Sequence, residues 1–337
     1  MNGLKYLTIK PTIYCAFDCP YCISRQSLFK ESKNRELSLD NWLNVFRQAD
    51  ELGCSYLDIS GGEPTMYKFL FPLIKGAKDL GWYVSINTAG IRISKMVDEL
   101  VAAGLDKVCI SLLSLDPEIN NKLRTGKNIS EQTYKGIEAI KNSPIDLALH
   151  FILSKHNYRE LPDVVQFAFN QNAAQLAIAF PENDHVLHTL LMNEEQIEEF
   201  ESIVLPKAIG VYEKLKKHNN SFPILFDKTL GSLNYSKGIY WNSLTEIVER
   251  CDKPHTFLLI YPNGDVMPCN GIEYTHKPIL GNVNKDKLAD IWENNIMEEF
   301  RKCRIQYCIN CPIKRHTGIA IEKIKIPPYS AEVIKWK

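Results

Sequence analysis

The sequence has no excess of charge of either sign, because 40 basic residues balance 40 acidic ones over its 337 residues. No polybasic block stands out, so electrostatics give no reason to expect nucleic acid or a membrane surface as a partner. No apolar run approaches the ~20 residues that span a bilayer, and no secretory signal precedes the first motif. These absences predict a cytoplasmic protein.

Cysteine, by contrast, is abundant, with ten in the chain. Without a secretory signal, clustered cysteines are more often metal-binding or catalytic than disulfide-bonded. Cys15, Cys19 and Cys22 stand in the segment Cys-Ala-Phe-Asp-Cys-Pro-Tyr-Cys. Iron–sulfur clusters are normally held by four thiolates, so three close ones leave one iron of a [4Fe–4S] cluster open to a substrate or cofactor. A zinc knot or three scattered structural cysteines is the competing interpretation.

A second motif, Ser60-Gly61-Gly62-Glu63-Pro64, follows the apolar run Tyr56–Ile59. That run predicts a buried strand. Two glycines at a strand end let a ligand approach the backbone closely, and a carboxylate beside them can accept hydrogen bonds from an ammonium group.

Short apolar runs alternate with amphipathic ones through residues 5–220, which predicts repeated βα units and a parallel sheet. Periodicity alone leaves open whether the sheet is flat and doubly wound or a partly closed barrel. The predicted strands are Tyr6–Ile13, Tyr56–Ser60, Tyr83–Asn87, Lys107–Leu113, Asp146–Leu153 and Gln175–Phe180. The predicted helices are Asn41–Leu52, Lys68–Leu80, Lys95–Ala103, Thr133–Lys141 and Tyr158–Asn170, with a longer one over Glu194–His218.

The cysteine motif and the Gly-Gly-Glu-Pro motif together resemble the radical S-adenosylmethionine (SAM) superfamily over Tyr6–Phe180. The resemblance implies a partial (β/α)6 TIM-like barrel with its site at the carboxyl ends of the strands. It also implies that Cys15, Cys19 and Cys22 hold a [4Fe–4S] cluster whose open iron binds SAM, the source of a 5′-deoxyadenosyl radical. Glu63, with the backbone of Gly61 and Gly62, is then expected to bind the methionyl ammonium.

The same resemblance suggests further contacts with SAM. Tyr21 occupies an aromatic position near the adenine, and Asn87 closes a strand where relatives carry polar residues. Ser111 and Arg124 are expected to contact SAM, since an arginine fork can hold a carboxylate bidentately. Core packing for Tyr21 and a surface ion pair for Arg124 are the alternatives.

The other cysteine group spans residues 251–311. Asn263-Gly264 between apolar arms predicts a hairpin. With these two residues as the whole turn, Cys269 lies opposite Leu258, on the side from which Cys251 enters. Cys251, Cys269, Cys308 and Cys311 make four ligands, which suits one cluster or a zinc ion. This stretch resembles the twitch subdomain, a single-cluster relative of the SPASM domain, and implies one auxiliary [4Fe–4S] cluster.

Three cysteines, Cys54, Cys109 and Cys303, stay outside both groups. Free cysteine is often a small buried hydrophobe, which we expect of Cys109. Cys303 is the best candidate to return a hydrogen atom to a substrate radical, and it could also replace an auxiliary ligand. Polar residues after the last two strands of the barrel are expected to face the substrate: His150, Glu182, Asn183, Asp184 and His185.

The predicted organisation is a radical SAM barrel over 1–220, a linker over 221–250, a small hairpin-plus-helix twitch/SPASM-like subdomain over 251–320 and a tail over 321–337. We expect an oxidoreductase or epimerase that acts on a small polar substrate of sugar, aminocyclitol or nucleoside type. An external one-electron reductant such as flavodoxin or ferredoxin would supply the electron. A peptide maturase is the alternative, although Cys15 comes too early for a preceding leader-binding domain. A non-enzymatic metal-stabilised module is a further alternative, which would leave the Gly-Gly-Glu-Pro placement unexplained.

Overall fold

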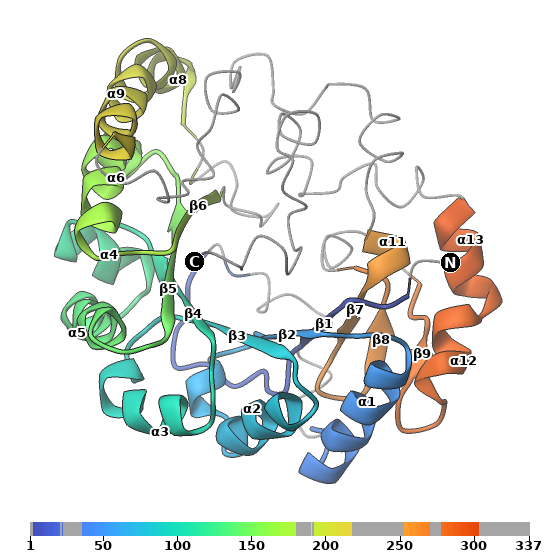
Figure 1. Ribbon diagram of the computed structural model, residues 1–337. Helices are drawn as coiled ribbons and strands as arrows, with labels where there is room; N and C mark the ends of the chain where they lie inside the picture. The colour runs from blue at the N-terminus through green and yellow to red at the C-terminus, as the bar shows by residue number, and fades with distance from the viewer. Residues whose placement is uncertain are drawn as a thin grey trace.

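The computed structural model describes residues 3–20, 22, 36–179, 190, 192–217, 253–269 and 278–302. Its centre is one sheet in the order β6-β5-β4-β3-β2-β1-β7-β8-β9. Strands β1 to β6 pair in parallel, β7 joins β1 in parallel, and β8 and β9 continue antiparallel. The sheet curves into an open arc with helices α1, α2, α3 and α5 along its convex side (Figure 1). The predicted fold class, an incomplete barrel, is confirmed.

The strands are short and begin where the sequence places them. Their bounds are β1 Tyr6–Ile9, β2 Tyr56–Ile59, β3 Tyr83–Thr88, β4 Lys107–Leu112, β5 Asp146–Ile152, β6 Gln175–Ala179, β7 Phe257–Ile260, β8 Asp265–Met267 and β9 Gly281–Asn282. The α-helices are α1 Leu39–Glu51, α2 Leu70–Asp79, α3 Val97–Ala102, α4 Pro117–Leu123, α5 Ile129–Lys141, α6 Leu161–Asn170, α8 Glu194–Glu199, α9 Leu205–Lys216, α11 Lys253–Thr256, α12 Leu288–Glu293 and α13 Asn295–Lys302. Short 3₁₀ turns occupy η3 Pro64–Met66, η4 Ile93–Lys95 and η5 Tyr158–Glu160. Within the described ranges, no helix is long and apolar enough to cross a membrane.

The helix predicted over Glu194–His218 is interrupted. A π-helical segment, η6 Phe200–Val204, separates α8 from α9, and Pro206 stands in the first turn of α9. Proline has no N–H to continue the i→i−4 pattern, which accounts for the change of winding just before it. The charged residues of 194–217 are therefore divided between α8 and α9.

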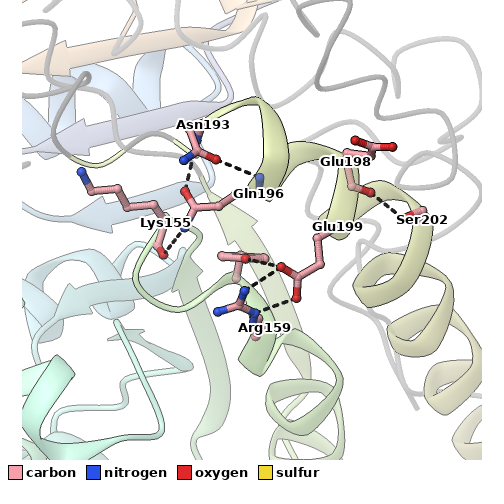
Figure 2. Close-up of polar contacts among 8 residues, drawn as sticks. Lys155, Arg159, Asn193, Gln196, Glu198, Glu199 and Ser202 are labelled. Carbon is pink, nitrogen blue, oxygen red and sulfur yellow. Dashed lines mark hydrogen bonds and ion pairs between the residues drawn. The ribbon is translucent and has the colours of Figure 1, made fainter.

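Helix α8 is fixed to the barrel by polar contacts at both ends (Figure 2). Asn193 and Gln196 form a reciprocal capping box at its start, and Gln196 also donates to the Lys155 carbonyl. At its end, the Arg159 guanidinium donates to both carboxylate oxygens of Glu199, at 2.6 and 2.7 Å. These bonds hold the pKa of Glu199 down at about 2, so the ion pair persists in mild acid.

The hairpin of β7 and β8 differs from the predicted register by one residue. Leu259 lies opposite Met267 and Ile260 opposite Val266, so the connection is three residues long rather than two. The Gly264 N–H donates to the Tyr261 carbonyl, and Gly264 has a φ of +91°. A left-handed glycine at the end of the loop is the geometry that three-residue hairpin loops prefer. Extended by two residues, the observed register sets Cys269 opposite Phe257, not Leu258.

The core lies between the convex side of the sheet and its helices. Leu57 on β2 is 0% exposed and belongs to the main apolar cluster. Leu57→Ala is expected to lower the free energy of unfolding by about 2–5 kcal/mol, because it removes buried methyl groups and leaves a cavity. Val101→Ala on α3, where the side chain is 37% exposed, is the matched control and should change stability by less than about 0.5 kcal/mol. Chemical denaturation of both variants measures the difference, and equal effects would contradict this placement of the core.

Candidate active site

The cysteine loop, residues 10–20 and 22, follows β1 and lies against the segment that follows β2. The Gly62 N–H donates to the Thr12 carbonyl at 2.9 Å, and the Glu63 N–H donates to the Tyr14 carbonyl at 2.8 Å. Both segments leave the carboxyl ends of neighbouring parallel strands, the edge at which barrel folds place their sites. Two backbone hydrogen bonds therefore set the position of the loop that carries Cys15.

The glycines of the second motif make this contact possible. A Cβ on Gly61 would lie 2.5 Å from the Thr12 carbonyl oxygen, and a Cβ on Gly62 would lie 2.2 Å from the Tyr14 carbonyl oxygen. Gly61 also has a φ of +117°, which side-chain-bearing residues rarely adopt. The sequence predicts that a ligand approaches these glycines, but the neighbour that fills the space is the cysteine loop itself. Their contact with SAM stays a prediction.

The Glu63 carboxylate is buried, with 2% exposure, and accepts four hydrogen bonds. Its Oε1 accepts from the Thr65 N–H, the Thr65 hydroxyl and the Thr88 hydroxyl, at 3.2, 2.6 and 2.6 Å. Among the described residues, its Oε2 accepts only from the Ala89 N–H, at 2.9 Å. Oε1 thus accepts three bonds and Oε2 one, so Oε2 is the oxygen with room for a further donor. Glu63 thus joins the segment after β2 to the end of β3, a structural role that the motif does not reveal.

Arg124 ties the cysteine loop to the end of β4. Its guanidinium donates to the Ser111 carbonyl at 2.5 Å and lies over the Phe17 ring, 5.8 Å from the centroid. The next residue, Thr125, accepts from the Asp18 N–H at 3.1 Å. Arg124 is 3% exposed, so the alternative of a surface ion pair is wrong. Phe17 and Asp18 lie between Cys15 and Cys19, and these contacts therefore fix the middle of the loop.

Unpaired polar atoms accompany Arg124. In the part of the chain that the structure describes, the buried Nε of Arg124 has no hydrogen-bond partner, and neither does the side-chain amide of Asn120. Asn120 lies one helical turn before Arg124 on α4 and is 1% exposed. Buried polar groups are nearly always hydrogen-bonded. Two buried donors without a partner, Arg124 Nε and the Asn120 amide nitrogen, are therefore expected where a polar ligand binds.

The concave face of the barrel carries more polar side chains than the convex face. On β2 to β5, the alternate apolar side chains have exposures of 0–2%. Several of the positions between them are polar and partly exposed. They include Asp58, Asn87, Lys107, Cys109, Ser111 and His150. Parallel strands are normally apolar on both faces, so this polar face is the exception that indicates a binding surface.

Asn87, predicted to face SAM or substrate, is bound by Asp58, a residue that the sequence motifs do not indicate. Its amide donates to both carboxylate oxygens of Asp58, at 2.7 and 2.8 Å. The signal was a charged residue at the third position of the apolar run Tyr56–Ile59, two residues before the glycine motif begins. Cys109 lies on the same face and is half-buried rather than buried, and its surroundings raise the pKa of its thiol to about 12 by desolvation.

Comparison with known proteins gives the family. Residues 9–168 match the model of the radical SAM superfamily, and residues 251–312 match the SPASM model, an iron–sulfur cluster-binding domain. This chain carries a radical SAM domain followed by a SPASM domain. The radical SAM domain implies a [4Fe–4S] cluster and SAM, and the SPASM domain implies auxiliary iron–sulfur clusters, which favours iron over the zinc alternative.

Several solved structures have a fold similar to that of this chain. SuiB of Streptococcus suis bound to its precursor peptide SuiA is 19% identical, with a TM-score of 0.68 over 93% of this chain and 71% of that one. SuiB bound to S-adenosylmethionine is 18% identical, with a TM-score of 0.66 over 94% and 70%. Native anSMEcpe with bound AdoMet is 18% identical, with a TM-score of 0.65 over 91% and 88%.

The residues of the radical SAM domain fit the cofactors that the family implies. Burial raises the pKa of the Cys15 thiol to about 11, and the charges of Glu63, Cys22 and Cys19 add to the rise, so the thiols share one electrostatic environment. Among the described side chains, no three of His, Cys, Asp and Glu already stand as a complete metal site. Three thiols on one loop, with an unpaired Arg124 Nε beside them, nevertheless supply the donors that a cluster and a SAM carboxylate require.

The structure leaves several predicted residues untested. Cys269 is described and buried at the end of the hairpin. The others lie outside the described residues, namely Tyr21, Glu182, Asn183, Asp184, His185, Cys251, Cys303, Cys308 and Cys311. Their roles stay predictions, as do the domain boundaries.

Gly62→Ala is expected to displace the cysteine loop. The new methyl would meet backbone atoms of Ile13 and Tyr14 at 2.2–2.7 Å, which should cost about 1–3 kcal/mol of stability and lower the iron retained after reconstitution. Gly210→Ala is the matched control, because nothing lies within 4 Å of its Cβ position and it stands inside helix α9. That control should gain up to about 1 kcal/mol. Normal iron content in a folded Gly62→Ala protein would contradict the contact.

Glu63→Gln tests both roles of this carboxylate. The amide group of glutamine would face an N–H or hydroxyl donor in place of an acceptor, so stability should fall by about 1–3 kcal/mol. SAM affinity should fall as well, with iron content retained. Glu51→Gln on the exposed end of α1 controls for the change of charge. Denaturation and SAM titration read the two roles separately, and unchanged SAM affinity would remove Glu63 from the ammonium site.

Proposed function

We propose that this protein is a radical SAM oxidoreductase or epimerase that acts on a small polar substrate of sugar, aminocyclitol or nucleoside type. When bound, the cluster and SAM supply a 5′-deoxyadenosyl radical, which removes a hydrogen atom from carbon. The outcome is dehydrogenation or epimerisation, with the help of one auxiliary [4Fe–4S] cluster.

The observation that carries this proposal is the polar concave face. Asp58, Asn87 and His150 are partly exposed on strands whose other face is buried and mainly apolar. A radical generated at the carboxyl ends of the strands would reach a substrate held on this surface. Hydrogen-bonding groups in a curved sheet suit a ligand with several hydroxyl or amino groups better than an apolar one.

Each part of the chain has a proposed task. Cys15, Cys19 and Cys22 hold the cluster that binds SAM. Glu63 binds the ammonium of SAM, while Arg124 and Ser111 bind its carboxylate side, and Gly61, Gly62, Asn87 and Tyr21 complete the pocket. Cys251, Cys269, Cys308 and Cys311 hold the auxiliary cluster. Cys303 is the proposed hydrogen donor for epimerisation, and a flavodoxin or ferredoxin supplies the electron.

A peptide substrate is the second candidate. The observation in its favour is the similarity of fold to SuiB, which has been solved with its precursor peptide SuiA. At 19% identity this likeness speaks for the fold, and the surface residues that would hold a peptide need not be shared. The two candidates differ in the source of the abstracted hydrogen.

An anaerobic assay with deuterated substrates separates them. The reconstituted enzyme is given SAM, a reductant and perdeuterated myo-inositol, glucose or adenosine, and the 5′-deoxyadenosine formed is analysed by mass spectrometry. Deuterium in 5′-deoxyadenosine from any of the three supports a small polar substrate. Label transfer only from a deuterated peptide panel would favour the peptide candidate.

Replacing Cys15, Cys19 and Cys22 with alanine should remove one of the clusters and abolish reductive SAM cleavage, since each cluster needs its thiolates. Replacing Cys308 and Cys311 is the matched comparison, because it should remove iron from the other site and leave SAM cleavage uncoupled from product. Iron content, secondary structure and SAM cleavage are measured for each soluble variant. Reductive cleavage by the triple variant would refute the ligand assignment.

A further inference from the structure

Asp58 is a carboxylate on the concave face that the proposed SAM site does not use. Its Oδ1 accepts from the Ser85 hydroxyl at 2.7 Å and from the Asn87 amide at 2.7 Å. Among the described residues, its Oδ2 accepts only from that amide, at 2.8 Å. The Tyr56 hydroxyl donates a hydrogen bond to the Ser85 Oγ at 3.0 Å. A carboxylate offers about two acceptor positions on each oxygen, so Oδ2 keeps one of its own.

Below Asp58 the face is closed by aromatic rings. Tyr56 and Tyr83 stack with centroids 5.3 Å apart, and Tyr6 meets Tyr56 edge-on at 5.7 Å. The Lys107 ammonium lies 5.8 and 5.9 Å from the centroids of Tyr56 and Tyr83. The rings form a floor at the amino ends of the strands. A ligand that reaches Asp58 therefore comes from the carboxyl ends, where the cysteine loop lies.

Two basic side chains act on Asp58. Lys107 and His150 both act on it from β4 and β5, and Cys109 lies between them on β4. Desolvation is the largest influence on the Asp58 carboxyl and raises its pKa, while Ser85, Lys107, Asn87 and His150 lower it. An ammonium group of a ligand would meet the Lys107 ammonium as well as Asp58. A neutral hydroxyl meets no such repulsion and can both donate to Asp58 and accept from a neighbouring cation.

We propose that Asp58, held by Ser85 and Asn87 and faced by Lys107 and His150, is the anchor for neutral hydroxyl groups of a polyhydroxylated substrate. This inference rests on the proposed function, because it names the part of the substrate that the concave face binds. Asp58 accepts a hydrogen bond from one hydroxyl, and the cationic side of the cluster donates to the oxygen of the same group or the next one along the ring. The reacting carbon then lies on the side of the ligand toward the cysteine loop.

Binding to the anaerobic SAM-loaded holoenzyme, without reductant, tests this inference apart from the chemistry. The probes are myo-inositol, methyl α-glucoside and glucosamine, followed by saturation-transfer NMR. The two neutral polyols should bind, and glucosamine should bind less tightly than methyl α-glucoside. Asp58→Asn should weaken polyol binding about tenfold or more, because a bond to a charged acceptor is lost. Asp98→Asn is the matched control: it removes the charge of an exposed aspartate on α3, away from Asp58 and Lys107, and it should leave binding unchanged.

Ser85→Ala provides a milder variant if Asp58→Asn does not fold, and it should weaken binding a few-fold, since the carboxylate keeps its charge but loses one support. Equal affinity in the wild type and the Asp58 variant, tighter binding of glucosamine, or no binding of any probe would each overturn the proposal. Polyol binding that depends on Asp58, without deuterium transfer in the activity assay, would refute the proposed reaction and leave the anchor standing.

Discussion

The candidate site depends on the close approach of two backbone segments, the cysteine loop after β1 and the Gly-Gly-Glu segment after β2. Their two hydrogen bonds join Thr12 to Gly62 and Tyr14 to Glu63. No Cβ fits at either glycine. Because Glu63 binds Thr65, Thr88 and Ala89 in turn, the same contact positions the end of β3. The glycines and the glutamate are therefore one structural unit before any cofactor is considered.

The polar concave face is the second constraint. A parallel sheet covered by helices on one side must be apolar there, which the residues at 0–2% exposure satisfy. The other side carries Asp58, Asn87 and His150. The desolvation of Asp58 is offset by its hydrogen bonds from Asn87 and Ser85. Stability and binding thus use opposite faces of the same strands. Substitutions on the concave face can consequently change specificity with little effect on the core.

The places where the sequence misled are instructive. The hairpin register is wrong by one residue because Pro262-Asn263-Gly264, with proline suited to a type I turn and glycine to its left-handed close, forms a three-residue loop. The long helix from Glu194 is interrupted before Pro206. Asp58 is not predicted as a site residue, because one charge within a four-residue apolar strand gives no pattern of its own. In each case a single residue, a proline or a charge, changes the local structure or role without changing the periodic pattern.

The sequence by itself determined the order of βα units, the cysteine motif and the presence of the Gly-Gly-Glu-Pro motif, since alternation, turn residues and spacing are local properties. Only the tertiary structure decided that the glycines face the cysteine loop and that Arg124 is buried against Phe17 and Ser111. It also brought Asp58, Ser85 and Asn87 together from neighbouring strands. These contacts depend on which strands pair and in which register, and that is fixed by packing over the whole sheet.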